Sequence, residues 1–210
     1  MPRSLPILLA RRLLRPLPGR SARAYFEPEL SYGRHYDPPE PSFRPAAVLA
    51  LLYPVEGQWF LPLTLRPVHM FDHAGQVSFP GGMVERGEST EAAAVREFAE
   101  ELGVMPPDLQ MLGSLSPINL YSTRFAITPW LAIASERPTM IPNPSEVAAV
   151  LETPLAELLN RDNYGRHIVQ RRGLRFSAPH IVIQGHRIWG ATALILGELI
   201  SLFHDAQSDL

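Results

Sequence analysis

Two apolar runs, Ala46 to Tyr53 and Trp59 to Leu65, open the most regular part of the hydrophobic pattern. Apolar runs of this length that are bounded by turn residues are typical of buried strands. The Glu56-Gly57 pair that separates them suits a tight turn. The pattern therefore predicts a β-hairpin at the start of the folded part of the chain.

Between Glu88 and Leu102 the apolar spacing becomes helical. Gly103 follows where a helix C-cap belongs. The apolar positions that share one face of this predicted helix are Ala92, Val95, Phe98, Ala99 and Leu102. The pattern further predicts strands over 111–115, 126–132 and 147–151, a short helix over 154–159 and a closing helix over 191–203.

The N-terminal part of the chain has a different character, and we expect a basic, proline-rich extension over 1–40 followed by a folded domain over 41–210. Four prolines in residues 37–45 favour an extended linker between them. Six arginines and no acid lie in residues 1–24, around a short apolar stretch that prolines interrupt, which makes a removed targeting peptide the weaker interpretation. A short helix packed on the domain or a mobile arm is favoured. Residues 1–24 are expected to be dispensable for turnover.

Composition narrows the classes of function. The chain has no cysteine, which excludes a disulfide framework, a thiolate metal site and a cysteine nucleophile. Its net charge of −2 gives no general attraction to nucleic acid, and no apolar run approaches the roughly 20 residues of a membrane span. Nucleic acid and membrane are therefore not expected partners, and a cytoplasmic location is expected.

Three carboxylates stand out within the predicted helix. At 100° per residue, Glu97, Glu100 and Glu101 fall within an arc of roughly 100° opposite the apolar face. A solvated acidic face is the simple interpretation. The preceding Phe79-Pro80-Gly81-Gly82 loop favours another, because its glycines allow a backbone carbonyl to turn toward the same place. Oxygen ligands of this kind suit Mg²⁺ or Mn²⁺.

These positions resemble the Nudix box, which is Gly, five residues, Glu, seven residues, Arg-Glu, an apolar residue, any residue, Glu-Glu, any residue, Gly and an apolar residue. The matching positions here are Gly82, Glu88 and the run Arg96-Glu97-Phe98-Ala99-Glu100-Glu101-Leu102-Gly103-Val104. The resemblance implies an α/β fold, the Nudix α/β/α sandwich with a mixed central sheet, for the domain over 41–210. It also implies that Glu97, Glu100, Glu101 and the Gly82 carbonyl bind the metal, and that Glu88 and Arg96 form an ion pair bracing loop against helix.

The segment from Leu63 to Gly82 is similar to the coenzyme A pyrophosphatase subfamily. That pattern reads Leu-Thr, any residue, Arg, six residues, His, any residue, Gly-Gln, an apolar residue, a small residue and Phe-Pro-Gly-Gly. Pro67 departs from it, since serine or alanine is usual there, but the spacing is intact. The later segments 144–147 and 188–192 are also similar to the subfamily.

Four further residues are candidates for the site. Arg66 is suited to grip a diphosphate or a 3′-phosphate with both arms of its guanidinium, or it forms a structural ion pair. His73 and Gln76 are candidate substrate-binding residues, and for His73 a hydrogen bond to the loop backbone is favoured over general-base catalysis. Glu146 is either a further base or metal ligand or an ordinary loop acid.

The resemblance implies metal-dependent hydrolysis of coenzyme A or its acylated or oxidised forms to 3′,5′-ADP and 4′-phosphopantetheine. Two alternatives stay open: a broader pyrophosphatase that takes ADP-ribose or NADH, and a Nudix protein that senses a ligand without catalysis. The expected partner is a small nucleotide, and a homodimer is left open. Glu97, Glu100 and Glu101 are expected to share the ligand and base roles.

Overall fold

The computed structural model describes residues 4–31, 34–69, 74–171 and 173–208. The α-helices are α1 (Leu5–Leu13), α2 (Arg20–Arg23), α3 (Thr90–Leu102), α4 (Leu155–Leu159) and α5 (Ala191–Ser208). The strands are β1 (Arg44–Val55), β2 (Gln58–Leu65), β3 (Val77–Ser78), β4 (Gly81–Met83), β5 (Gln110–Ser114), β6 (Ile118–Leu120), β7 (Phe125–Ile133), β8 (Ala149–Pro154), β9 (Tyr164–Arg171), β10 (Leu174–Ile183) and β11 (His186–Trp189).

The larger sheet has eight strands and runs β3-β2-β1-β7-β5, with β4 paired to β1, β6 to β7 and β8 to β2. The β1–β7 pair is parallel and the other pairs are antiparallel, so the sheet is mixed, as expected. The predicted hairpin is confirmed: Tyr53 pairs with Phe60, and the turn residues Glu56 and Gly57 both have positive φ. A two-residue hairpin turn of one common type requires that geometry.

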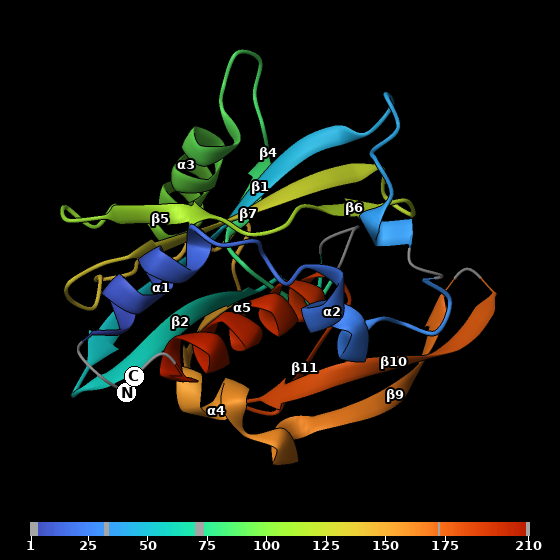
Figure 1. The fold of residues 1–210 in the computed structure, drawn as a ribbon. Helices are drawn as coiled ribbons and strands as arrows, with labels where there is room; N and C mark the ends of the chain where they lie inside the picture. The colour runs from blue at the N-terminus through green and yellow to red at the C-terminus, as the bar shows by residue number, and fades with distance from the viewer. Residues whose placement is uncertain (1–3, 32–33, 70–73, 172, 209–210) are drawn as a thin grey trace.

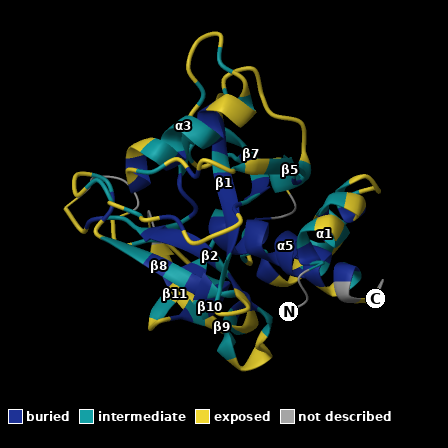
Figure 2. Ribbon diagram, turned by 90° about the vertical axis from the view of Figure 1, so that its left-hand side faces the viewer, coloured by how far each residue is buried: buried dark blue, intermediate teal, exposed yellow. Residues whose placement is uncertain are grey.

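Helices cover both faces of this sheet, which gives the expected α/β/α sandwich (Figure 1). On one face α3 packs on β1 through a cluster that includes Phe98, Leu102 and Leu49. On the other face α5 lies between the large sheet and the smaller sheet, and it is the most buried helix (Figure 2). In the described part of the chain, no helix is long and apolar enough to span a membrane.

A second sheet of three strands, in the order β11-β10-β9, covers the outer side of α5. The sequence analysis assigned no strands to residues 164–189. One face of this sheet carries Ile181 and Ile188 into the core, whereas its other positions alternate with arginines and histidines. The apolar pattern is therefore weak, and long-range pairing decides the structure.

The N-terminal segment is part of the domain core. Leu5 and Leu9, one helical turn apart on α1, are fully buried in the same cluster as Leu199 and Phe203 of α5, and Phe26 is also buried there. The packed-helix interpretation is thus correct and the mobile-arm alternative is wrong. Residues on both sides of the expected boundary at residue 40 share this core, and the removal of residues 1–24, which is expected to leave turnover unchanged, would take buried side chains out of it.

Candidate metal and diphosphate site

Local sequence fixes both ends of α3. The Ser89 side chain accepts a hydrogen bond from the Ala92 backbone N–H at 3.1 Å, which is an N-cap. Gly103 ends the helix in the left-handed region, with φ 65°. Because the Phe98 side of the helix is buried on β1, the acidic side is held toward the loop before the helix.

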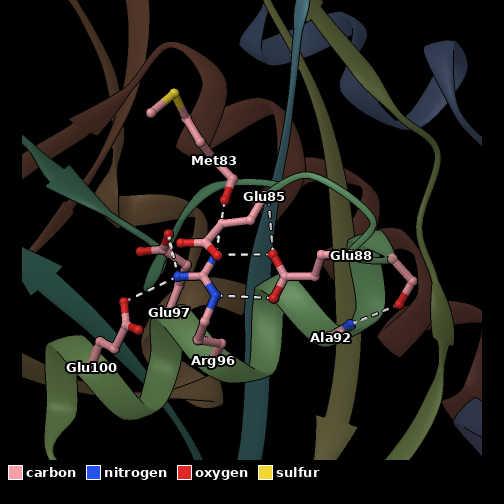
Figure 3. Close-up of polar contacts among 8 residues, drawn as sticks. Met83, Glu85, Glu88, Ala92, Arg96, Glu97 and Glu100 are labelled. Atoms are coloured by element: carbon pink, nitrogen blue, oxygen red, sulfur yellow. Dashed lines mark hydrogen bonds and ion pairs between the residues drawn. The ribbon is translucent and has the colours of Figure 1, made fainter.

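Arg96 is the centre of this acidic side (Figure 3). Its Nε and Nη2 donate to the two carboxylate oxygens of Glu88 at 2.9 and 3.0 Å, so the expected ion pair is present. Nη2 also donates to the Met83 carbonyl, and Nη1 donates to Glu97 at 2.9 Å and Glu100 at 3.0 Å. The guanidinium lowers the pKa of Glu88, and the acids raise the pKa of Arg96. Arg96 therefore ties the loop after β4 to the helix.

Glu101 lies apart from this network and is 3% exposed, unlike the solvated acid that the helical spacing allows. Its Oε2 is buried and has no hydrogen-bond partner in the described structure. Burial raises the pKa of Glu101 to about 8, the charge of Arg66 opposes that shift, and repulsion by Glu146 and Glu97 adds to it. A buried carboxylate oxygen without a partner is costly, and a cation is the kind of group that would satisfy it.

The glycine pair before the helix makes room for these acids. Gly82 lies on β4 opposite Ala47 of β1, and a Cβ at this position would occupy the space of the Glu97 carboxylate. Gly81 has a φ of 154°, and a Cβ there would overlap the Ala47 carbonyl. Any larger residue at either position would displace the strand or the glutamate.

The structure brings Arg66 and Gln76 together at the base of one loop. The Arg66 backbone N–H donates to the Gln76 carbonyl at 3.0 Å, and Gly75 N–H donates to the Arg66 carbonyl at 3.2 Å. The Arg66 Nε is buried and has no hydrogen-bond partner among the described residues, and the Arg66 charge acts on Glu101. His73 lies outside the described residues.

Glu146 also reaches this site, from a turn that the sequence analysis did not connect to α3. Asn143 N–H donates to the Glu101 carbonyl at 2.8 Å, and Glu146 N–H donates to the Asn143 carbonyl at 3.0 Å. The charge of Glu146 acts on both Glu97 and Glu101. Asn143 is the residue that sequence reasoning missed, and the only signal for it was the Asn-Pro turn that begins at this position.

The donors at this site fit a hard divalent cation, although the described residues do not form a ready-made metal cluster. No group of three histidine, aspartate or glutamate side chains among them is arranged around one ion position. Arg96 accounts for this, since its Nη1 holds an oxygen of Glu97 and one of Glu100. Among the described residues, the Glu101 Oε2 is buried and has no hydrogen-bond partner.

Glu88→Ala and Arg96→Ala are both expected to lower thermal stability and activity, and their effects should not add. Arg96→Ala should cause the larger loss, because Arg96 also holds Met83, Glu97 and Glu100. A double-mutant cycle on melting temperature and kcat/KM measures the coupling. Additive losses would contradict the bracing role of the pair. Glu91→Ala, an exposed acid in the first turn of the same helix, is the matched control.

Known proteins resemble this chain in sequence and in fold. Residues 43–171 match the family model described as the NUDIX domain. A protein from Photorhabdus laumondii described as the uncharacterized Nudix hydrolase NudL is 38% identical over 140 residues, 66% of this chain and 74% of that protein. A protein from Salmonella newport with the same description is 39% identical over 153 residues, 71% of this chain and 79% of that protein. A crystal structure of the MutT protein from Methanosarcina mazei, 16% identical, covers 77% of this chain and 95% of that protein with a TM-score of 0.50, a likeness of fold alone.

Proposed function

The chain belongs to the Nudix hydrolase family, and we propose that it cleaves the diphosphate bond of coenzyme A or its acylated or oxidised forms. The products would be 3′,5′-ADP and 4′-phosphopantetheine. The reaction would require Mg²⁺ or Mn²⁺, since the available donors are carboxylate and carbonyl oxygens.

One observation supports coenzyme A most directly. In the segment similar to the coenzyme A pyrophosphatase pattern, Leu63 to Gly82, the end of β2 pairs with β3, and the Arg66 N–H just beyond β2 donates to the Gln76 carbonyl just before β3. The charge of Arg66 acts on Glu101, and Gly82 lies against the Glu97 carboxylate. One segment of the chain therefore carries residues expected to recognise the substrate as well as Gly82, whose carbonyl is expected to bind the metal.

In the proposed reaction, the acidic residues bind the metal ions and the basic residue binds the substrate phosphate. Glu97, Glu100, Glu101 and the Gly82 carbonyl would hold the ions, with Glu146 as a further ligand or base. Bound divalent ions would supply Lewis acidity and neutralise the diphosphate. A glutamate would accept the proton of the attacking water. Arg66, whose Nε has no hydrogen-bond partner in the described part of the chain, would donate to a phosphate oxygen of the substrate.

A product assay on coenzyme A, ADP-ribose and NADH, each with Mg²⁺ and with Mn²⁺, tests this proposal. Coenzyme A should give 3′,5′-ADP and 4′-phosphopantetheine with a kcat/KM at least about tenfold above the other two, a barrier difference of about 1.4 kcal/mol. Removing the metal with a chelator should abolish turnover, and adding it back should restore turnover. A preference for ADP-ribose or NADH would favour the broader pyrophosphatase, and turnover of none would overturn the proposal.

A further inference from the structure

The smaller sheet carries an aromatic and basic cluster that the metal site does not use. His167 on β9, His180 on β10 and Arg187 and Trp189 on β11 form this cluster, which we call the histidine face. The strand register places them on one side, because His180 pairs with Trp189, Val182 with Arg187, and Ala178 with His167. Residues two apart on a strand share a face.

The rings of the histidine face are packed in a fixed arrangement. The Nδ1 atoms of His167 and His180 are 3.1 Å apart, and the His167 ring meets the Trp189 ring edge to face, with centroids 5.6 Å apart. A Cβ at Gly165 would come within 3.0 Å of the His180 ring, so the glycine lets the imidazole lie close to the strand. His180 is 7% exposed, whereas His167 and Trp189 are half-buried and remain accessible.

The charge on this face favours an anion. Arg187 is exposed, and in the described part of the chain no ion pair joins it to a carboxylate. Burial lowers the pKa of both histidines, and the nearby Arg187 charge acts in the same direction. A cation would meet the guanidinium as a like charge. A phosphate would pair with Arg187 and accept hydrogen bonds from imidazole N–H groups.

The histidine face is linked to the diphosphate site through the start of α5. Three residues after Trp189, the Thr192 hydroxyl donates to the Val77 carbonyl at 3.0 Å in a buried contact. Val77 begins β3, one residue after Gln76 and five residues before Gly82. Five residues of extended chain span at most about 18 Å. The face is therefore joined, through Thr192 and Val77, to the segment of chain that leads to Gly82.

We infer that His167, His180, Arg187 and Trp189 form a subsite for the phosphorylated nucleoside end of the substrate. Arg187 and an imidazole N–H bind a phosphomonoester on the ribose, and the accessible part of Trp189 stacks on the base. This inference rests on the proposed function, because coenzyme A carries a ribose 3′-phosphate and ADP-ribose and NADH do not. The subsite would explain a preference among substrates that share the same diphosphate.

Steady-state kinetics of Arg187→Gln on coenzyme A and on dephospho-coenzyme A test the inference. The variant should raise KM for coenzyme A about tenfold with kcat nearly unchanged, and should leave both constants for the dephosphorylated substrate as they are. Arg175→Gln is the matched control: Arg175 is exposed on the opposite face of the same sheet, by the alternation of β10. The Arg175→Gln variant should leave KM and kcat unchanged for both substrates. An equal effect of Arg187→Gln on both substrates, or no effect on either, would overturn the subsite.

A binding measurement separates this inference from the proposed function. Calorimetry without metal should show that the wild-type protein binds 3′,5′-ADP about tenfold more tightly than 5′-ADP, and that Arg187→Gln removes the difference. If the wild type turns over no coenzyme A yet shows this preference, the proposed function fails and the subsite stands. If it cleaves coenzyme A without the preference, the subsite fails and the function stands.

Discussion

Glu101→Gln is expected to lower kcat at least about a hundredfold, a barrier increase of about 2.7 kcal/mol, while the protein folds normally. The side chain keeps its shape and can still accept the Gly81 backbone hydrogen bond. It loses the negative charge of the carboxylate. In the wild type, one oxygen of that carboxylate, Oε2, has no hydrogen-bond partner in the described structure. If that oxygen holds a cation, the neutral amide is a much poorer ligand.

The thermal stability of Glu101→Gln is the control that separates a loss of catalysis from a loss of folding. Burial disfavours the Glu101 carboxylate, so the amide should leave the melting temperature of the metal-free protein unchanged or higher. Glu91→Gln, exposed in the first turn of the same helix, should retain wild-type turnover. Glu101→Asp should also lose turnover, because the aspartate side chain is one methylene shorter and does not place its carboxylate where the glutamate does. Turnover near that of the wild type at saturating metal would show that Glu101 is not a ligand.

The helix α3 was predictable because its signals are local. Apolar spacing, the acidic run and Gly103 all lie within one segment, and the same holds for the hairpin around Glu56 and Gly57. The burial of Glu101 was not predictable in this way. It depends on Gly81 before the helix and on the 141–147 turn, which is bonded to the end of α3 through Asn143. Helical spacing alone places Glu101 beside Glu97 and Glu100 but does not say what covers it.

The smaller sheet and the N-terminal helices were harder to predict from the sequence, because their structure also depends on contacts with distant segments. The strands β9, β10 and β11 pair mainly with one another, and their exposed face interrupts the apolar pattern with arginine and histidine. In the N-terminal segment, the i, i+4 spacing of Leu5 and Leu9 was a usable signal. A second signal was Glu198, an acid in the middle of an apolar closing helix, which requires a buried partner.

That partner is Arg23 of α2, and both side chains are completely buried. The Arg23 guanidinium donates to Glu198 and to the carbonyls of Ser116 and Pro117. Glu198 also accepts from the Ser116 N–H and hydroxyl and from the Gly19 N–H. Burial lowers the pKa of Arg23, and the neighbouring carboxylate opposes that shift. The pair thus joins the N-terminal segment to α5 at a place from which water is excluded.

Arg23→Met is expected to destabilise the fold by about 3–5 kcal/mol, because it leaves the Glu198 charge buried without its cation. For a chain of this size that corresponds to a fall in melting temperature of roughly 6–20 °C. Arg12→Met should cost about 1 kcal/mol or less, because its partner Asp205 is 43% exposed in its side chain. Thermal and urea unfolding followed by circular dichroism measure both variants.

The double variant Arg23→Met with Glu198→Gln decides whether the uncompensated charge causes the loss. The glutamine carbonyl can still accept from the Gly19 N–H and the Ser116 hydroxyl, which both bind the same oxygen of Glu198, and the glutamine carries no charge. Stability should therefore recover by at least about 1 kcal/mol relative to Arg23→Met alone, since the two changes act on contacting partners. At a temperature where all variants are folded, kcat should match the wild type, because the pair lies outside the candidate metal site. An Arg23→Met protein as stable as Arg12→Met would mean that the N-terminal segment is not anchored through this ion pair.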